Sequence, residues 1–572
     1  MIDAEHEAAE RLLDRMAVGG VSRRRFLATA AALGLAGALD PLGADLAIAA
    51  GETQTRNRAA LKARYDYIVV GAGAAGCIVA ARLAEAGAEV LLVEAGGTDD
   101  LPQVATPGIW FTNLGGPLDW KFQAQPAAAV AGRRVPMAMG RVLGGGTSIN
   151  ALLWVRGLAS DFDGWAAQGC DGWSFADILP VYRSLEDWQG GANQWRGAGG
   201  PLSVVIAATP HPTAAAFVEA ARDMGVPVLD DMNGPMREGT GYVNMSITRA
   251  GTRASAARAF LRPALARRNL TLLLETDVTR LRIAGAHCRG VTLSQNGRLR
   301  DVAAAKEVIV CAGGMFSAKL LMLSGIGDAG ELRRAGVAPV ADLPGVGRNF
   351  QDHPLLFGVV ASYRGKMPPH AMTSNAVEAA AYVRSDTALT DPDVKMVLMQ
   401  LPVVTDEIRA QFGAPPPDAF TVSPALVRPT SRGKLSLKSA DWRQPAELDA
   451  GFLSTEHDLD RTVRCIEMCR ELVARKPFDA VRDREIIPGR PLAKSELRTF
   501  ARNATISFGH PVGTCRMGKD RDAVVDPALR VHGIAGLRVC DSSVMPTIIT
   551  GPTQAPAMMI GAKAAGLILS AA

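Results

Sequence analysis

The stretch that decides the fold is "YDYIVVGAGAAGCIVAARLAEAGAEVLLVEAGG", Tyr65 to Gly97. It begins with a continuous apolar run and passes through Gly71, Gly73 and Gly76 in a G-x-G-x-x-G spacing. An alanine-rich helical segment follows, and a second apolar run ends at Glu94. A strand, a glycine turn, a helix and an acid about 20 residues later are typical of a βαβ dinucleotide-binding unit. The sequence therefore predicts an α/β fold in which the helix N-terminus receives a pyrophosphate.

Glu94 is predicted to hold the hydroxyls of the adenosine ribose. NAD and FAD both fit this fingerprint, and a glycine turn without any ligand is the structural alternative. A second glycine cluster lies in "GRVLGGGTSINALLWVRGLASDFDGWA", which begins at Gly140. The backbone amides of such a cluster suit an inner phosphate and a flavin ring, so this segment favours FAD.

Five motifs in order extend the pattern to the C-terminus. After the two glycine segments come "GGMFSAKLLMLSGIG" from Gly313, "LPGVGRNFQDHP" from Leu343 and "VVDPALRVHGIAGLRVCDSSVMPT" from Val524. From about Tyr65 onward the chain resembles the glucose–methanol–choline (GMC) oxidoreductases. The resemblance implies FAD as cofactor and an alcohol as the small-molecule substrate. It also implies a Rossmann-like FAD-binding domain and a discontinuous substrate domain built on an antiparallel sheet, α+β overall.

The resemblance assigns the cofactor site residue by residue. The expected FAD-binding residues are Gly71, Gly73, Ala74, Ala75, Gly76, Glu94, Ala95, Arg141, Gly144, Gly145, Thr147, Asn150, Ala151, Val278, Asp541, Pro552 and Thr553. Family members that attach FAD to a histidine carry that histidine just before the motif asparagine, where this chain has Ile149. Non-covalent FAD is therefore expected. No metal site is expected.

The stretch "SFGHPVGTCRMG" contains His510, one of eight histidines in the chain. Oxidation of an alcohol requires a base for the hydroxyl proton, and imidazole can accept it near neutral pH. In the resembling family the histidine at this position is that base, so His510 is the expected catalytic residue. The alternative is a core histidine with a satisfied hydrogen bond. His353 and His532 fall where the family has structural histidines.

The second catalytic position of the family departs from its usual pattern. Family members usually carry histidine or asparagine five residues after the threonine of "MPT", and this chain has Pro552 there. Proline has no donor to offer a substrate hydroxyl. Thr550, Thr553 and Gln554 are therefore expected as polar substrate contacts beside Pro552. The last helix, which begins near these residues, is expected to direct its positive end at the flavin.

The expected domain organisation is discontinuous. Residues 62–161, 246–354 and 502–572 are predicted to form the FAD-binding domain, and residues 162–245 and 355–501 the substrate-binding domain. Residues 1–49 are predicted to be a twin-arginine signal peptide, because Arg23 and Arg24 precede a weakly apolar run that ends at Asp40. Periplasmic location or secretion is expected, with no membrane-spanning segment after signal removal.

Bulk properties restrict the partners. A net charge of +5 without a lysine- and arginine-rich run argues against nucleic acid. The eight cysteines have no Cys-x-x-Cys spacing and are interpreted as buried apolar residues. A quinone or cytochrome is a candidate electron acceptor. Two other functions stay open at this point: a lyase or decarboxylase with a non-redox or photochemical flavin, and an electron-transfer flavoprotein subunit.

Overall fold

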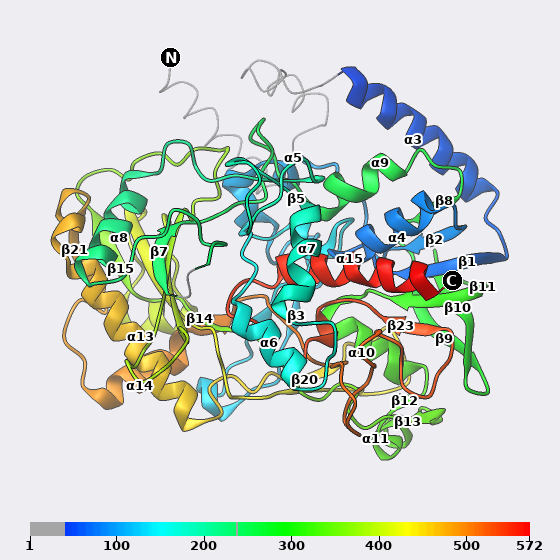
Figure 1. Ribbon diagram of the computed structural model, residues 1–572. Coiled ribbons are helices and arrows are strands. Elements are labelled where there is room, and N and C mark those ends of the chain that lie inside the picture. Colours follow the sequence, from blue (N-terminus) through cyan, green and yellow to red (C-terminus); the bar gives the residue numbers. More distant parts are fainter. Residues whose placement is uncertain (1–40, 236–237, 572) are drawn as a thin grey trace.

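The computed structural model describes residues 41–235 and 238–571, which form two lobes around two large sheets (Figure 1). The first sheet has seven strands in the order β8-β2-β1-β11-β10-β9, with β23 beside β11. Their bounds are β1 Arg64–Val70, β2 Val90–Val93, β8 Leu270–Leu273, β9 Asp277–Ala284, β10 His287–Gln295, β11 Arg298–Val310 and β23 Leu537–Val539.

The parallel part of this sheet is built from short apolar runs. Strands β8, β2, β1, β11 and β23 are parallel, and Ile68 of β1 lies between Leu91 of β2 and Val308 of β11. All four residues of β2 are buried. Continuous apolar strands of this kind are covered on both faces, as the βαβ pattern requires. Helices α4 (Gly76–Glu85), α10 (Gly313–Leu323) and α15 (Gln554–Ala571) belong to this lobe, and α15 lies against α4 (Figure 1).

The second sheet has eight strands, all paired antiparallel, in the order β21-β15-β18-β17-β16-β7, with β14 and β22 attached through β18. Their bounds are β7 Gly239–Tyr242, β14 Pro354–Leu356, β15 Val360–Tyr363, β16 Ala379–Val383, β17 Val394–Met399, β18 Ala419–Leu426, β21 Arg482–Ile487 and β22 Thr505–Ser507. Helices α8 (Pro212–Asp223), α13 (Glu456–Ala474) and α14 (Lys494–Ala504) share a core with one face of it.

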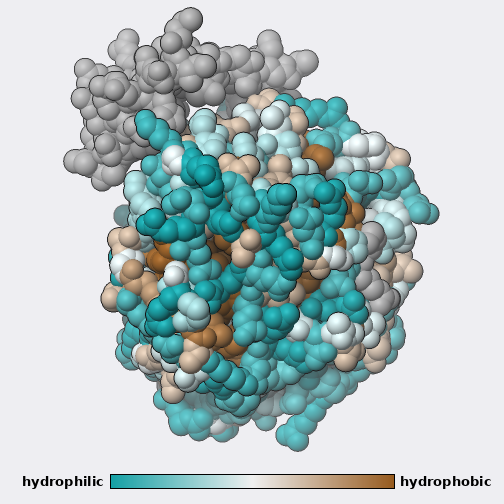
Figure 2. Space-filling model, turned by 90° about the vertical axis from the view of Figure 1, so that its left-hand side faces the viewer, coloured by the Kyte–Doolittle hydropathy of each residue, from teal (hydrophilic) through white to brown (hydrophobic). Residues whose placement is uncertain are grey.

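The two faces of this second sheet have different neighbours. Val394, Met396 and Leu398 of β17 pack in the core shared with the helices. Val397 lies on the opposite face in a cluster with Leu152, which follows the glycine-rich loop of the first lobe. Because side chains alternate along a strand, every second residue of β17 is directed toward the first lobe. The outward side of the second lobe is mostly hydrophilic, with small, separated hydrophobic patches (Figure 2).

The sheets agree with the expected α/β lobe and antiparallel lobe, with two differences in extent. Phe162, Trp165 and Trp173, expected in the substrate domain, are fully buried in the core of the first lobe. The indoles of Trp165 and Trp173 donate to Thr547 O (3.0 Å) and Pro527 O (2.9 Å), and such long-range partners have no local sequence signal. Strand β22, which lies in the segment expected in the FAD domain, joins the second sheet.

Most of the remaining elements are short, apart from the 19-residue helix α3 and the 11-residue helix α7. The helices are α3 Pro41–Ala59, α5 Pro102–Ala105, α6 Ala159–Ala167, α7 Phe175–Leu185, α9 Arg262–Ala264, α11 Ala329–Arg334 and α12 Asp406–Phe412. The 3₁₀ or π turns are η2 Pro107–Asn113, η3 Ala128–Val130, η4 Gly145–Ser148, η5 Ala257–Leu261, η6 Lys476–Ala480 and η7 Ser542–Val544. The short strands are β3 Phe122–Gln123, β4 Pro136–Met137, β5 Glu186–Trp188, β6 Leu202–Val204, β12 Ile326–Gly327, β13 Ala341–Asp342, β19 Lys434–Ser436 and β20 Glu447–Asp449.

Helix α3 attaches to the edge of the first sheet. The buried side chain of Gln54 donates to Leu270 O (2.9 Å) and accepts from Leu272 N (2.9 Å). The side-chain amide of Gln54 therefore forms hydrogen bonds with backbone groups of the edge strand β8 that a neighbouring strand would otherwise use. The twin-arginine motif itself lies outside the described residues. Among the described helices, none combines the length and apolar character needed to cross a bilayer.

The cysteines follow the interpretation made from the sequence. All eight are buried and unpaired. Burial raises the pKa of the Cys77 and Cys311 thiols well above the ordinary value. They therefore pack as small apolar side chains rather than as reactive thiols.

Candidate active site

The turn after β1 leaves backbone open to a ligand. A side chain on Gly76 would place Cβ 1.9 Å from Gly71 O, so glycine is needed there for close packing of the turn. At Gly73, by contrast, a Cβ would meet nothing within 4 Å, and the space beside it is free. Helix α4 follows with no side-chain hydrogen bond at its N-cap, Ala75. Free space, accessible backbone and an uncapped helix N-terminus fit a pyrophosphate.

Glu94 closes this turn at the end of β2. Its carboxylate accepts from Ala72 N (2.9 Å) and Gly96 N (2.8 Å), with one bond to each oxygen. Burial raises the pKa of Glu94 to about 6, against the lowering effect of these two hydrogen bonds. Each carboxylate oxygen keeps acceptor capacity, which a ribose hydroxyl can use. Val278, the expected adenine contact, lies at the start of β9, two residues after Thr276, whose backbone amide donates to Glu94 O (3.0 Å).

The two glycine segments meet in space. A Cβ on Gly145, which has φ +55°, would lie 2.9 Å from the Cα of Gly73. Thr147 ties the second loop together, because its hydroxyl donates to Gly144 O (2.6 Å) and accepts from Ala256 N (3.0 Å). Arg141, at the start of this loop, lies with its guanidinium 4.7 Å from the Trp120 ring. The structure thus brings together the two segments assigned separately from the sequence.

Arg253 supports this loop and was not found from the sequence. Its guanidinium is fully buried and donates to Asn150 O (2.8 Å), Asn150 Oδ1 (2.9 Å) and Val104 O (2.7 Å). Burial lowers the pKa of Arg253 to about 9. The arginine fixes the orientation of the Asn150 amide. Its surroundings, "GTRASAA", carry no motif, so only the fold identifies it.

Two of the expected substrate contacts, Thr550 and Gln554, have hydrogen-bond partners within the protein. The Thr550 backbone amide and hydroxyl both donate to Asp161 (2.7 and 2.9 Å). Gln554, the first residue of α15, accepts a short bond from Asn150 Nδ2 and donates to Ser246 Oγ (3.0 Å). A buried loop must satisfy its own polar groups, and these bonds do so. The substrate-contact role of Thr550, Gln554, Pro552 and Thr553 stays a prediction.

Asp541 lies where two neighbouring strands of the first sheet, β11 and β23, end. It follows β23 and accepts from Gly313 N (2.9 Å), Ser317 Oγ (2.5 Å) and Ser543 N (2.8 Å). Burial raises the pKa of this carboxyl despite these bonds. Gly313 and Ser317 belong to α10, so Asp541 holds the turn that leads from β11 into that helix.

His510 and His353 form a direct pair. Their Nδ1 atoms lie 2.9 Å apart, and the ring of His353 is fully buried. The backbone amide of His510 donates to Asp352 Oδ1 (3.0 Å), and its ring stacks on Phe508 with 4.5 Å between centroids. His532 lies elsewhere, with Nε2 3.2 Å from Gly518 O. His353 was expected to have only a structural role, but its ring contacts the candidate base and so belongs to the candidate site.

Burial governs the charge of this pair. It lowers the pKa of His353 to about 3 and the pKa of His510 well below the ordinary value, and the charge of Lys395 lowers both further. Asp352 is shifted in the other direction, because burial raises its pKa to about 7. Both imidazoles are therefore neutral at pH 7. A neutral imidazole is the form that can accept a proton.

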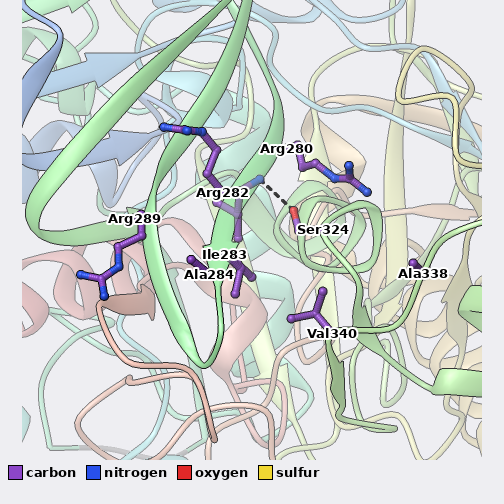
Figure 3. A pocket seen from close by; sticks show the side chains of 9 residues that line it. Arg280, Arg282, Ile283, Ala284, Arg289, Ser324, Ala338 and Val340 are labelled. Carbon is purple, nitrogen blue, oxygen red and sulfur yellow. Dashed lines mark hydrogen bonds between the residues drawn. The ribbon is translucent and has the colours of Figure 1, made fainter.

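A separate surface pocket of about 430 Å³ lies on the outer side of the first sheet (Figure 3). It is lined by Arg280, Leu281, Arg282, Ile283, Ala284, Arg289, Ser324, Ala338 and Val340. None of these residues belongs to the expected cofactor or substrate site. Arg282 is paired with Asp301 (3.0 Å), and Leu281 N donates to Ser324 Oγ (2.9 Å). Arg282 is therefore used by the fold itself, and the pocket is distinct from the candidate active site.

The βαβ turn, the second glycine loop and the histidine pair define a two-lobed, nucleotide-dependent enzyme of the α/β class. Two family models, both described as GMC oxidoreductase, match residues 65–355 and 429–561. The chain belongs to the GMC oxidoreductase family. It is an oxidoreductase of the type that acts on CH–OH donors.

Individual relatives cover most of the chain. It is 36% identical to the mitochondrial choline dehydrogenase of Homo sapiens, with 94% of each sequence covered. It is 37% identical to the oxygen-dependent choline dehydrogenase of Rhizobium johnstonii, over 88% of this chain and 95% of that one. The crystal structure of pyridoxine 4-oxidase from Mesorbium loti superposes with a TM-score of 0.84 at 35% identity, over 88% of this chain and 98% of that one.

Proposed function

We propose that this chain is an FAD-dependent alcohol dehydrogenase or oxidase in which His510 is the catalytic base. FAD, when bound, supplies the acceptor for the hydride that leaves the CH–OH carbon. The open backbone at Gly73, the uncapped α4 N-terminus and the Glu94 carboxylate would hold the ADP half. The Gly144–Gly145 loop, Asn150 and the start of α15 would face the remainder of the cofactor.

The observation that carries the proposal is the hydrogen bond between the Nδ1 atoms of His510 and His353. One of the two nitrogens must carry the proton, because two lone pairs cannot bond. Nε2 of His353 is buried without a hydrogen-bond partner among the described residues, and Nδ1 is directed at His510. Action of His510 as a base requires that His510 Nδ1–H donates to His353 Nδ1, and we propose this tautomer, in which Nε2 of His353 carries the other proton.

This tautomer leaves a lone pair on Nε2 of His510. No hydrogen bond from the described residues involves that atom, so it is free to accept the proton of a substrate hydroxyl. A positioned general base is worth about 10² to 10⁴ in rate. Pro552 can offer neither a donor nor a proton path, and His510 is the base without help from that position.

Anaerobic addition of alcohols to the purified holoenzyme tests the reaction class. Oxidation of an alcohol reduces the flavin and bleaches its absorbance. A lyase or decarboxylase reaction forms product with no net bleaching. The panel should include aliphatic, benzylic and heteroaromatic alcohols and sugars. Choline and pyridoxine should be added because relatives are named for them. Product formation without bleaching would replace the proposal by the lyase alternative.

We also propose non-covalent attachment of the flavin. Ile149, buried at the end of the glycine-rich loop, offers no nucleophile, and within the described residues none of the histidines belongs to that loop. Acid precipitation should therefore release yellow FAD into the supernatant. Flavin that remains on the denatured polypeptide would contradict the proposal.

Export by the twin-arginine route is proposed from the sequence around Arg23 and Arg24. Exchange of both residues for lysine should retain folded, flavin-loaded precursor in the cytoplasm, because this route transports folded proteins. Unchanged export of the variant would contradict it. Reoxidation of the reduced enzyme by oxygen, a quinone or a cytochrome, compared side by side, identifies the electron acceptor and tests whether docking to a redox partner is the main role.

A further inference from the structure

Lys395 is a buried cation at the inner face of the second sheet. It lies on β17 in register with Tyr382 of β16, and its side chain is fully buried. The preceding and following residues, Val394 and Met396, pack against the helices, so Lys395 is directed to the opposite face, toward the first lobe. Within residues 41–235 and 238–571, its Nζ has neither a hydrogen-bond partner nor an ion pair.

The neighbours of Lys395 place it at the candidate active site. Its Nζ lies 4.9 Å from the centroid of the Tyr382 ring and 5.4 Å from that of Phe508, and Phe508 stacks on His510. The buried Tyr382 hydroxyl also lacks a hydrogen-bond partner among the described residues. It lies 3.5 Å from the point where a Cβ on Gly551 would be, immediately before Pro552. Lys395 and Tyr382 therefore lie between His510 and the Pro552 loop.

The acidic groups of this region are occupied by other donors. Asp161 accepts from both polar groups of Thr550 and lies 3.7 Å from Arg428. Asp352 accepts from Ser507 Oγ and from the backbone of His510. Glu378 and Asp393 have their own partners, the first with Ser374 and the second with Ser385. The described residues thus leave the Lys395 ammonium without a counter-charge.

An unpaired buried ammonium is costly, and a ligand that supplies an anionic acceptor removes that cost. We propose that Lys395 and Tyr382 bind an anionic oxygen substituent of the alcohol substrate, such as a carboxylate or an ionised aromatic hydroxyl. The inference rests on the proposed alcohol oxidation and specifies its substrate class. The same positive charge disfavours a quaternary ammonium group at this position, so a cationic alcohol should bind less well than an anionic one.

The Lys395 ammonium should lose its proton within the pH range in which binding can be measured. Burial lowers the pKa of Lys395 to about 7, and the charged or titratable groups around it are His353, His510 and the Tyr382 hydroxyl, with Asp161 beyond Tyr382. Protonated Lys395 predominates below pH 7 and neutral amine above it. A bound anion stabilises the ammonium and raises this pKa, so anion affinity should decrease as the pH rises above about 7.

Binding measurements on the holoenzyme test the site without requiring turnover. Benzoate, benzamide and phenyltrimethylammonium have similar size and different charge, and acetate serves as a smaller anion. Perturbation of the flavin absorbance gives each dissociation constant. Wild-type protein should bind at least one anion, with an affinity that decreases from pH 6 to pH 8.5. In Lys395→Met, the anion should bind at least about tenfold more weakly, with benzamide unchanged, because a hydrogen bond to a charged group is lost.

Two further variants exclude a general effect on folding. Tyr382→Phe removes only the hydroxyl and should weaken the anion severalfold. Lys563→Met is the matched control, because Lys563 also lies over an aromatic ring, 5.2 Å from the centroid of Trp173, but on α15 away from this cluster. It should leave anion binding unchanged. Flavin content and the melting temperature of every variant show whether the fold is intact.

The outcomes separate this inference from the proposed function. Anion affinity unaffected by Lys395→Met, absence of any anion binding, or equal affinity for phenyltrimethylammonium would overturn the inference. A uniform loss of flavin reduction for neutral and anionic alcohols would assign Lys395 to the reacting hydroxyl instead, and would overturn it as well. Anion binding that depends on Lys395 in a protein that oxidises no alcohol would overturn the proposed function and leave the anion site intact.

Discussion

The Nδ1 atoms of His353 and His510 lie 2.9 Å apart, and the two rings are nearly perpendicular, with an interplanar angle of 87°. The two residues come from segments 157 positions apart, the "QDHP" motif and the "GHP" motif. This contact fixes the orientation of the His510 ring and, with the tautomer proposed above, exposes its Nε2 to the substrate. Predictions about either histidine therefore have to consider the pair.

His510→Ala should retain FAD and reduce it more slowly by about 10²- to 10⁴-fold, because the positioned base is lost. Anaerobic stopped-flow with the best alcohol of the panel measures the rate. His532→Ala is the control, since its ring is hydrogen-bonded to Gly518 O away from the pair and its loss should leave the rate unchanged. Rapid reduction of His510→Ala would remove this residue as the base.

His353→Leu should slow flavin reduction by at least about tenfold, or ~1.4 kcal/mol of barrier, because the acceptor for His510 Nδ1–H is lost. His353→Asn can place its side-chain oxygen close to the former Nδ1 position and should recover much of the rate. The comparison of the two variants, at equal flavin content, separates ring positioning from general destabilisation. Equal rates in both variants would contradict the positioning role.

The pH dependence of flavin reduction with a neutral alcohol should lack an acidic limb near pH 6.5. Burial lowers the pKa of His510 well below that value, so the imidazole stays unprotonated as the pH falls through 6.5. The limb should appear only at more acidic pH, where the histidine gains its proton and the rate decreases. A midpoint at or above pH 6.5, measured with a neutral alcohol to avoid the titration of Lys395, would contradict this expectation.

Pro552→Ala should change the rate of flavin reduction by less than about tenfold, or ~1.4 kcal/mol. Proline contributes shape here rather than a proton path, and the loop that carries it is held independently by the bonds from Thr550 to Asp161. The measurement is the same stopped-flow reduction. A collapse in Pro552→Ala, with His510→Ala nearly intact, would mean that pocket shape governs the reaction.

Glu94→Ala should lower the FAD occupancy of the purified protein more than its turnover per bound flavin. The carboxylate accepts from Ala72 N and Gly96 N in the turn. Its proposed contact is to the ribose, which takes no part in hydride transfer. Flavin content per protein is read from the absorbance ratio, and turnover is normalised to it. Full occupancy in the variant would show that the assignment of Glu94 is wrong.

The sequence by itself determined the α/β class and identified the glycine turn at Gly71–Gly76 and the acid at Glu94, while the family resemblance identified His510 as a candidate. These features are local: a βαβ turn needs particular residues at a fixed spacing within one short segment, and that spacing can be read without any tertiary contact. The family resemblance was likewise carried by short motifs in a fixed order. The assigned roles of the individual site residues stay predictions until the experiments above are done.

Only the tertiary structure decided which side chains meet. It paired His353 with His510, directed Thr550 and Gln554 to protein partners, and placed the tryptophans after residue 161 in the core of the first lobe. Alternation along β17 can tell which face Lys395 occupies, but not that His510 and the Pro552 loop lie opposite it. Such contacts join segments far apart in the chain, where hydrogen-bond satisfaction and packing act on the whole fold and leave no local pattern in the sequence.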